Sequence, residues 1–531
     1  MQDVSDYLII GAGSAGCVLA ARLSENPAHR VLLLEAGPPD RDPWIHLPAG
    51  YARLFASGRY DWGYATEPEP ELNERRVNWP RGRVLGGSGS INGLVFLRGS
   101  PHDFDRWAQS GATGWSYDDV LPFFRRMEQW LGGVGTSRGR EGPLPVSQVT
   151  RLSKGAEAFI AACEGMGYRR NSDMNDGDIA GVMPIQMNVR KGRRISTARA
   201  YLHPALKRPN LQLRTGFTAQ RILLDGTRVT GVQARDDRGA LHNLHARQVV
   251  LCAGALASPQ LLMLSGLGDG EHLRSLGIDV ALHCPQIGLN LQDHLIARLA
   301  FRTRRAGTVN EVMRSRWSLA RAVGGYALRR SGPLAVGATE ATLFAAVTPG
   351  AEEAEVQFQF INFALGSAGY VLTPEPGMML NFGQCRPESR GSVRLRSGNS
   401  DDKPLIRANY LDSAADQRIM IDAMRLGRRI ARAEPLAGLI EADLAPSAET
   451  PDDAAMLDYI RAAGTTVYHP CGTCRMGSDA AAVLDPQLRL RGIQGLRVAD
   501  ASVMPLIPSS NIQAAVIMVA EHAAELLRRG S

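Results

Sequence analysis

The chain has 531 residues, of which 44% are hydrophobic and 21% charged, and its formal net charge is +7. These proportions are typical of an ordinary soluble protein, and the length predicts two lobes instead of one compact core. The arginines are mixed with acids and form no long basic run, which argues against nucleic-acid binding. Seven cysteines lie between Cys17 and Cys474 without framework spacing, so we expect reduced thiols and a cytoplasmic location. No apolar run reaches the ~18 residues of a membrane span.

The first motif is "DYLIIGAGSAGCVLAARLSENPAHRVLLLEAG", residues 6–37. It predicts a buried strand, a glycine turn, a helix and a second buried strand that ends in an acid. Gly11 permits the tight turn, Gly13 lets the backbone approach a pyrophosphate, and Gly16 lets helix and strand pack closely. Glu35 follows 24 positions after Gly11, where a carboxylate can accept hydrogen bonds from a ribose. The unit predicts dinucleotide binding but does not distinguish FAD from NAD.

Signals of the same kind return far along the chain. Residues 209–251 alternate apolar and polar side chains through several short strands, and "VVLCAGALASPQLL" then predicts a strand, a small-residue turn and a helix. The last segment contains "LRVADASVMP" and a predicted helix from about Ile512 to Leu527. Three separated segments that build one cofactor lobe are typical of flavoproteins.

Four further stretches carry a resemblance: "WPRGRVLGGSGSINGLVFLRG", "GALASPQLLMLSGLG", "IGLNLQDH" and "YHPCGTCRMG". With the motifs above, and in this order, the sequence resembles the glucose–methanol–choline (GMC) oxidoreductases, flavoenzymes that oxidise alcohols, over nearly its whole length. It looks most like the branch of bacterial choline dehydrogenases and aliphatic alcohol dehydrogenases. The resemblance implies a mixed α/β fold with a discontinuous Rossmann-like FAD-binding lobe, 1–150, 190–300 and 466–531. A substrate lobe of antiparallel sheet and helices would comprise 151–189 and 301–465.

The resemblance also assigns cofactor contacts. It places the ADP half of FAD on the first motif, the isoalloxazine beside the "GGSGSIN" loop, and the remaining contacts further along the chain: Gly11, Gly13, Gly16, Glu35, Gly86, Gly87, Ser88, Asn92, Ala219, Asp500, Ala501 and Gln513. A plain chain reversal is the alternative explanation of the glycine loop. Relatives that bind flavin covalently carry a histidine where this chain has Ile91, so noncovalent FAD is expected.

His469 aligns with the family histidine that faces flavin N5, and Asn511 aligns with its partner. An alcohol donates hydride only after its hydroxyl loses a proton, and neutral imidazole is a suitable base near pH 7. Asn511 would hold the substrate oxygen. Cys471 and Cys474 have the spacing of a redox pair or half a zinc site, but no second pair of ligands exists, so we interpret them as packing residues and expect no metal.

Substrate contacts are expected at Glu340, Gln359, Val467 and Tyr468. Glu340 aligns with a glutamate near the trimethylammonium group in choline-using relatives. A choline-site histidine is replaced by Gln359, which argues against choline as substrate.

The expected function is oxidation of a primary alcohol to an aldehyde, with electrons passed to a quinone or another acceptor that is not oxygen. An oxygen-reducing oxidase is the first alternative. A hydroxynitrile lyase, a flavin photodecarboxylase and a flavin-free binding module are more remote alternatives. The oligomeric state remains open.

The segment "EVMRSRWSLARAVGGYALRRSG", residues 311–332, has an amphipathic pattern. We assign its apolar face to Met313, Trp317, Ala320 and Leu328, and its basic face to Arg314, Arg321, Arg329 and Arg330. Such a helix could lie on an anionic membrane. We favour a helix that covers the substrate cavity with its apolar face inward, so that Trp317 or Tyr326 selects substrates.

Overall fold

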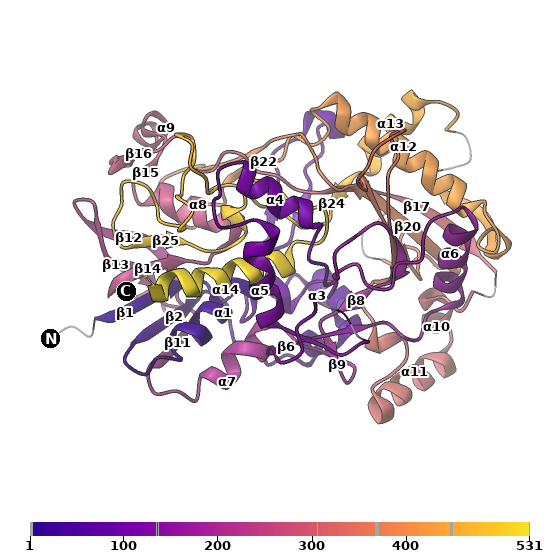
Figure 1. The fold of residues 1–531 in the computed structure, drawn as a ribbon, viewed down its shortest axis with the longest axis horizontal. Coiled ribbons are helices and arrows are strands. Elements are labelled where there is room, and N and C mark those ends of the chain that lie inside the picture. Colours follow the sequence, from indigo (N-terminus) through magenta and orange to yellow (C-terminus); the bar gives the residue numbers. More distant parts are fainter. Residues whose placement is uncertain are drawn as a thin grey trace.

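The computed structural model describes residues 4–133, 135, 137–304, 306–366, 371–446 and 450–529. Two large sheets dominate this part of the chain, and helices pack against each of them (Figure 1). The fold is mixed α/β, as predicted. The helices are α1 (Ser14–Leu23), α2 (Pro43–His46), α3 (Tyr51–Ser57), α4 (Pro101–Gln109), α5 (Tyr117–Met127), α6 (Lys154–Gly165), α7 (His203–Ala205), α8 (Gly254–Leu264), α9 (Gly270–Ser275), α10 (Val309–Arg314), α11 (Arg316–Arg329), α12 (Ala414–Ala431), α13 (Asp453–Ala463) and α14 (Gln513–Arg529).

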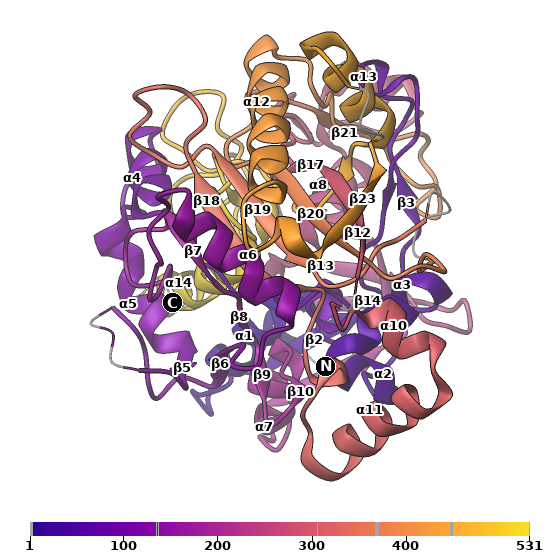
Figure 2. The same cartoon turned by 90° about the vertical axis from the view of Figure 1, so that its right-hand side faces the viewer.

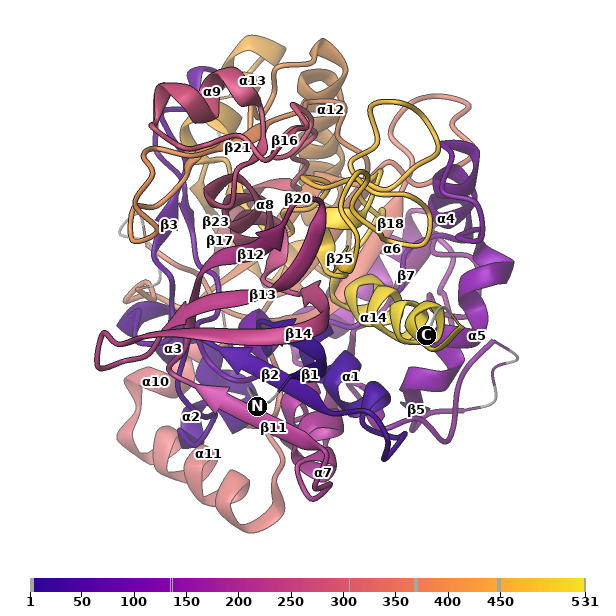
Figure 3. The same cartoon turned by 90° about the vertical axis from the view of Figure 1, so that its left-hand side faces the viewer.

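The first sheet has the strand order β11-β2-β1-β14-β13-β12, and β25 pairs with β14 (Figure 3). Its central pairs are parallel, whereas β12, β13 and β14 form an antiparallel extension. The strands come from three separated parts of the chain: β1 (Ser5–Ile10), β2 (Val31–Glu35), β11 (Leu211–Thr215), β12 (Thr218–Asp225), β13 (Arg228–Arg235), β14 (Leu241–Leu251) and β25 (Leu496–Val498). The predicted strand–helix–strand unit is confirmed as β1, α1 and β2.

Helix α1 is buried along most of its length because α14 covers the side that faces away from the sheet (Figure 1). The predicted last helix is therefore confirmed, with bounds shifted by one or two residues. A fully buried carboxylate, Glu521 on α14, fixes this contact. It accepts hydrogen bonds from Arg22 and Arg126, both at 2.8 Å, and from the Tyr201 hydroxyl at 2.8 Å.

The second sheet is antiparallel and has the order β23-β17-β20-β19-β18-β7, with β24 beside β17. Helices α12 and α6 cover one face (Figure 2). On β20, Met378, Leu380 and Phe382 point into the core on that side, because successive side chains alternate between the faces. Its strands are β7 (Gly181–Pro184), β17 (Leu295–Thr303), β18 (Thr339–Ala345), β19 (Val356–Ile361), β20 (Gly377–Gln384), β23 (Ile440–Ala445) and β24 (Thr465–Thr466).

The predicted boundary at residues 300 and 301 falls inside β17, all of which belongs to the second sheet. The division into domains stays a prediction. The remaining strands are short and form separate small sheets: β3 (Tyr64–Ala65), β4 (Asn78–Trp79), β5 (Glu128–Trp130), β6 (Leu144–Gln148), β8 (Gln186–Met187), β9 (Val189–Arg190), β10 (Arg193–Arg194), β15 (Leu267–Gly268), β16 (Leu282–His283), β21 (Ser392–Arg394) and β22 (Leu405–Arg407). In the described residues, no helix is both long enough and apolar enough to cross a bilayer.

Candidate active site

One cavity of about 1740 Å³ runs between the two sheets. Most of the residues predicted to bind cofactor or substrate line it: Gly11, Gly13, Glu35, Gly87, Ser88, Asn92, Ala219, Glu340, Gln359, Val467, Tyr468, His469, Asp500, Ala501, Asn511 and Gln513. Gly16 and Gly86 do not line it. The cavity therefore joins the dinucleotide motif at one end to the face of the second sheet at the other.

The turn between β1 and α1 has the geometry of a dinucleotide cradle. Gly11 has φ +96°, and a Cβ there would lie 2.6 Å from the Cys252 carbonyl oxygen. A Cβ on Gly16 would lie 1.9 Å from the Gly11 carbonyl oxygen, which explains why helix and turn approach so closely. Around Gly13 the nearest atoms would be 3.9 Å away, so this face is open. The cradle fits a pyrophosphate at the N-terminus of α1.

Glu35 ends β2 at the edge of this cradle. Its carboxylate accepts hydrogen bonds from the Ala12 and Gly37 amides at 2.9 and 2.8 Å. Burial raises the pKa of Glu35 to about 7, and the two amides oppose that rise. The carboxylate lines the cavity, where a ribose hydroxyl could donate to it.

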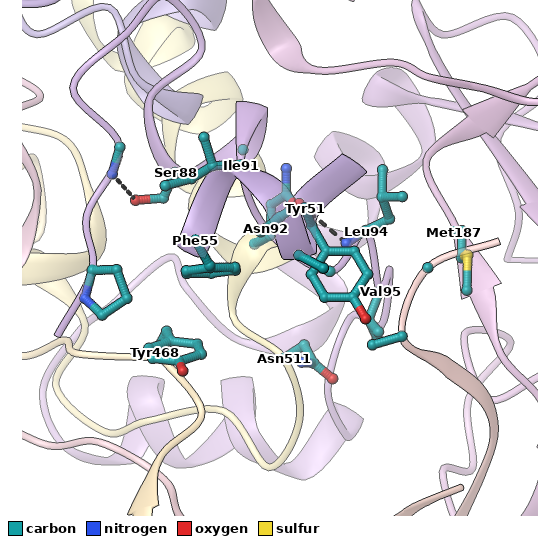
Figure 4. A pocket seen from close by; sticks show the side chains of 18 of the residues that line it. Tyr51, Phe55, Ser88, Ile91, Asn92, Leu94, Val95, Met187, Tyr468 and Asn511 are labelled. Atoms are coloured by element: carbon teal, nitrogen blue, oxygen red, sulfur yellow. Dashed lines mark hydrogen bonds between the residues drawn. The ribbon is translucent and has the colours of Figure 1, made fainter. Parts of the chain in front are cut away.

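The glycine-rich loop packs against the cradle, and Figure 4 shows its residues Ser88, Ile91 and Asn92 at the wall of the cavity. Gly86 and Gly87 have φ +84° and +54°, and a Cβ on Gly87 would lie 2.8 Å from the Gly13 Cα. Asn92 donates to the Gln513 side chain at 2.6 Å, so the loop is connected to the start of α14. Ile91 is buried in an apolar cluster with Ile45, Leu54, Tyr60 and Val84.

Sequence reasoning missed Arg194, whose guanidinium donates hydrogen bonds to this loop. The guanidinium is buried and donates to the Asn92 side-chain oxygen at 2.7 Å and to the Asn92 backbone oxygen at 2.6 Å. It also donates to the Ile45 carbonyl at 2.8 Å. Among the described residues it has no carboxylate partner, and burial lowers its pKa to about 9. It therefore adds positive charge beneath the loop.

His469 sits in a chain of hydrogen bonds that defines its tautomer. The Nε2 of His294 is 2.8 Å from the Cys385 carbonyl oxygen, which can only accept, so this nitrogen carries the hydrogen. The Nδ1 of His294 is then an acceptor, and it lies 2.9 Å from Nδ1 of His469, which must donate. The lone pair of His469 is therefore on Nε2. That atom is 3.1 Å from the Asn511 side-chain nitrogen.

Burial lowers the pKa of His469 well below 6.5, and His294 and Arg81 add to this effect. Burial also lowers the pKa of His294 to about 4. Both imidazoles are neutral near pH 7, and an unprotonated Nε2 lines the cavity. The cavity wall therefore contains an imidazole nitrogen that can accept a proton near pH 7.

The motif "LNLQDH" positions the two loops that carry His469 and Asn511. Asn290 and Gln292 donate to the Pro505 carbonyl at 3.2 and 3.0 Å, and the Gln292 side-chain oxygen accepts from the Ile507 amide at 3.0 Å. Asp293 accepts from the His469 amide at 2.7 Å. His294 then contacts the ring of His469 itself. The sequence displays this motif, but its role is visible only when the three loops are brought together.

Asp500 is predicted to contact the cofactor. Its carboxylate accepts hydrogen bonds from other residues of the protein. It accepts from the Gly254 amide at 2.8 Å and from the Ser258 hydroxyl at 2.6 Å. Two further bonds come from the amide and hydroxyl of Ser502. Asp500 thus shapes the turn before α8 that lines the cavity.

The two cysteines that follow His469 have fully buried thiols. Cys471 and Cys474 belong to the core of the first sheet and are not joined to each other. Burial raises the pKa of each thiol. No group of metal-binding side chains occurs among the described residues.

Val467 and Tyr468 precede His469 at the cavity wall. Tyr468 stacks on Phe55 with 5.4 Å between ring centroids (Figure 4). Glu340 is turned toward Ser153, whose amide donates to it at 2.8 Å, and burial raises the pKa of this glutamate.

The predicted apolar face of α11 is wrong. Trp317 and Leu328 are 87% and 86% exposed. The face that lines the cavity has the helical spacing i, i+3, i+4, i+7, namely Leu319, Ala322, Val323 and Tyr326. The Tyr326 hydroxyl donates to the Gly192 carbonyl at 2.9 Å and so determines which face points inward. The helix covers the cavity as expected, but Trp317 has no access to a substrate.

The sequence profile of the GMC oxidoreductases matches residues 5–296 with its N-terminal part and residues 387–520 with its C-terminal part. The chain belongs to this family. It is 40% identical to the oxygen-dependent choline dehydrogenase of Brucella suis, over 98% of this chain and 95% of that protein.

Solved structures of similar fold include pyridoxine 4-oxidase from Mesorbium loti, with a TM-score of 0.91, 35% identity and 99% of both chains covered. A formate oxidase variant of Aspergillus oryzae RIB40, whose FAD modification was studied, has a TM-score of 0.93 and 27% identity over 100% of this chain and 99% of that chain.

Proposed function

We propose that this protein is an FAD-dependent alcohol dehydrogenase that oxidises a primary alcohol to an aldehyde. The observation that carries the proposal is the unprotonated Nε2 of His469, which faces the Asn511 amide in a cavity that begins at a dinucleotide cradle. Relatives named as choline dehydrogenase and pyridoxine 4-oxidase support an alcohol as the substrate.

The residues present fit FAD. The backbone at Gly11 and Gly13 would hold the pyrophosphate, Glu35 the ribose, and the loop Gly86–Asn92 would lie beside the ring system. When bound, FAD supplies the hydride acceptor. Ile91 has no nucleophilic atom, so we propose that FAD is held without a covalent bond.

The substrate hydroxyl would approach His469 and Asn511 from the cavity and replace the contact of 3.1 Å between their side chains. The hydroxyl donates to Nε2 of His469, and the oxygen accepts from the Asn511 amide. Proton transfer to Nε2 produces an imidazolium, and the alkoxide that forms pushes electron density toward its α-carbon. Asn511 stabilises this negative oxygen and fixes its orientation.

A proton that passed from Nδ1 of His469 to His294 could go no further, because the other nitrogen of His294 faces a carbonyl oxygen. His294 Nε2 in turn donates to Cys385. The base must therefore release its proton back through the cavity when the aldehyde leaves. We propose a quinone or another acceptor that is not oxygen as the recipient of the electrons, following the dehydrogenase branch that the sequence resembles.

The experiment is anaerobic mixing of the purified holoprotein with primary alcohols in the dark. Bleaching of the oxidised-flavin absorbance, with the aldehyde as product, supports the proposal. A lyase or a photodecarboxylase would leave the flavin oxidised under these conditions. Repeating the reaction with a quinone and with oxygen then compares the two acceptors, and faster reoxidation by oxygen would indicate an oxidase.

A further inference from the structure

Three neighbouring strands of the second sheet present a row of polar side chains to the cavity. Arg298 on β17 is directly opposite Asn381 on β20, and Asn381 is directly opposite Gln359 on β19. All three line the cavity. They lie on the face that α12 does not cover, because the residues on either side of them in each strand belong to the core beneath that helix.

This row has no partners within the described protein. None of the three side chains forms a hydrogen bond or ion pair with another described residue, and the buried Nε of Arg298 and the buried Oδ1 of Asn381 lack any partner. Asn381 is only 7% exposed. Buried polar groups are normally hydrogen-bonded, so an unpaired guanidinium beside two unpaired amides indicates a ligand.

The charge around the row favours an anion. Arginines outnumber carboxylates on the cavity wall, where the carboxylates are Glu35, Glu340 and Asp500. Glu35 and Asp500 lie at the cofactor end of the cavity. Glu340, on β18, already accepts a hydrogen bond from the Ser153 amide. Among the described residues, no carboxylate forms an ion pair with Arg298.

The row also lies at a suitable distance from the base. His294, the partner of His469, directly precedes β17, and Arg298 follows it by four residues, which corresponds to about 13 Å at the rise of a β-strand. Asn381 precedes Cys385, whose carbonyl holds His294, by the same number of residues. A substrate on the order of 10 Å long could therefore place its hydroxyl at His469 and its other end at the row.

We infer that Arg298, Asn381 and Gln359 form a recognition site for an anionic oxygen group, a carboxylate or a phosphate, at the end of the substrate opposite the reacting hydroxyl. Guanidinium groups bind such anions through two parallel hydrogen bonds, and side-chain amides add further donors. This inference rests on the proposed alcohol oxidation and names the class of alcohol.

The test separates binding from turnover. The first measurement is binding of para-methylbenzoate, which has no hydroxyl to oxidise, to the oxidised holoprotein, followed through the flavin absorbance. The neutral control is para-methylbenzamide. Tighter binding of the carboxylate by about 10- to 100-fold is expected, since hydrogen bonds to a charged group contribute that much. Equal binding of the two compounds would overturn the inference, whatever the protein oxidises.

The second measurement compares the Michaelis constants of three alcohols: benzyl alcohol, para-(hydroxymethyl)benzoate and para-(hydroxymethyl)phenyl phosphate. A lower Michaelis constant for either anionic alcohol than for benzyl alcohol supports the site. The alcohol with the larger decrease identifies the recognised group as a carboxylate or a phosphate. Arg298→Gln should remove the advantage while FAD stays bound. Arg302→Gln is the matched control, because Arg302 lies on the same strand but pairs with Glu441 at 3.2 Å. An advantage that survives Arg298→Gln would overturn the assignment.

Discussion

The hydrogen bond between His294 and His469 predicts a mutational effect with a definite size. In His294→Leu, the hydrogen on Nδ1 of His469 loses its acceptor, although a leucine of similar volume fills the space. An unsatisfied buried donor costs about 1–3 kcal/mol, and the ring can avoid this cost by moving the hydrogen to Nε2. In that tautomer Nε2 cannot accept the substrate proton. The rate of flavin reduction should therefore fall by about 5- to 150-fold, since 1.36 kcal/mol corresponds to a factor of ten.

The matched variant is His294→Gln. A glutamine can accept from Nδ1 of His469 and donate to the Cys385 carbonyl, so it should restore most of the rate at a pH above the pKa of His469. The pH profile gives a readout that a loss of packing would not change. Since His294 helps to lower the pKa of His469, its replacement by leucine should raise that pKa and move the acid limb of the profile to higher pH.

The assay is stopped-flow reduction of the bound flavin by a saturating alcohol, with FAD content and thermal stability measured on each variant. The reasoning is refuted if the leucine variant reduces its flavin at the wild-type rate. It is also refuted if leucine and glutamine are equally slow with the same pH profile, because the loss would then not depend on the tautomer.

The remaining predictions concern the base, the cofactor, the helix over the cavity and the contact between α1 and α14. His469→Ala should lower flavin reduction by roughly 10²–10⁴ while FAD stays bound; a near wild-type rate in stopped flow would remove this residue from the mechanism. Acid precipitation should release FAD because Ile91 cannot bind it covalently, and flavin in the washed pellet would contradict this. Tyr326→Ala should change the relative rates for long and short alcohols, whereas Trp317→Ala should not, and the reverse result would restore the predicted inward face. Glu521→Gln should destabilise the fold by about 3–5 kcal/mol in denaturant unfolding, because two guanidinium groups lose their buried carboxylate; a change below about 1 kcal/mol would show that the contact does not depend on this charge.

Local patterns explain what the sequence could predict. The first motif folds as expected because its glycine turn, its helix and its acidic residue contact one another, and all of them lie within the first 37 residues. The last helix is also a local pattern, and His469 and Asn511 are identified by family resemblance. The contact of the cradle with Cys252 follows from the pairing of β1 with β14, whereas the glycine-rich loop meets Gln513 at the start of α14.

Long-range register explains what the sequence could not predict. Arg298, Asn381 and Gln359 are far apart in the chain and become neighbours only through the pairing of β17, β20 and β19. Helix α11 shows a different reason, since apolar residues occur on both of its faces. Its phase is determined by the Tyr326 contact with Gly192, which is more than a hundred residues away.

The second sheet connects the base to the proposed anchor for the substrate. The Cys385 carbonyl, immediately after β20, fixes the tautomer of His294 and through it that of His469. Asn381 lies on the same strand, in the row that we assign to the far end of the substrate. The strands β17 and β20, which carry Arg298 and Asn381, therefore also position His294 and the Cys385 carbonyl that fix the tautomer of the base, whereas His469 itself lies on the loop after β24. Substitutions at the row should accordingly change the Michaelis constant more than the limiting rate, whereas substitutions in the cradle should change cofactor binding first.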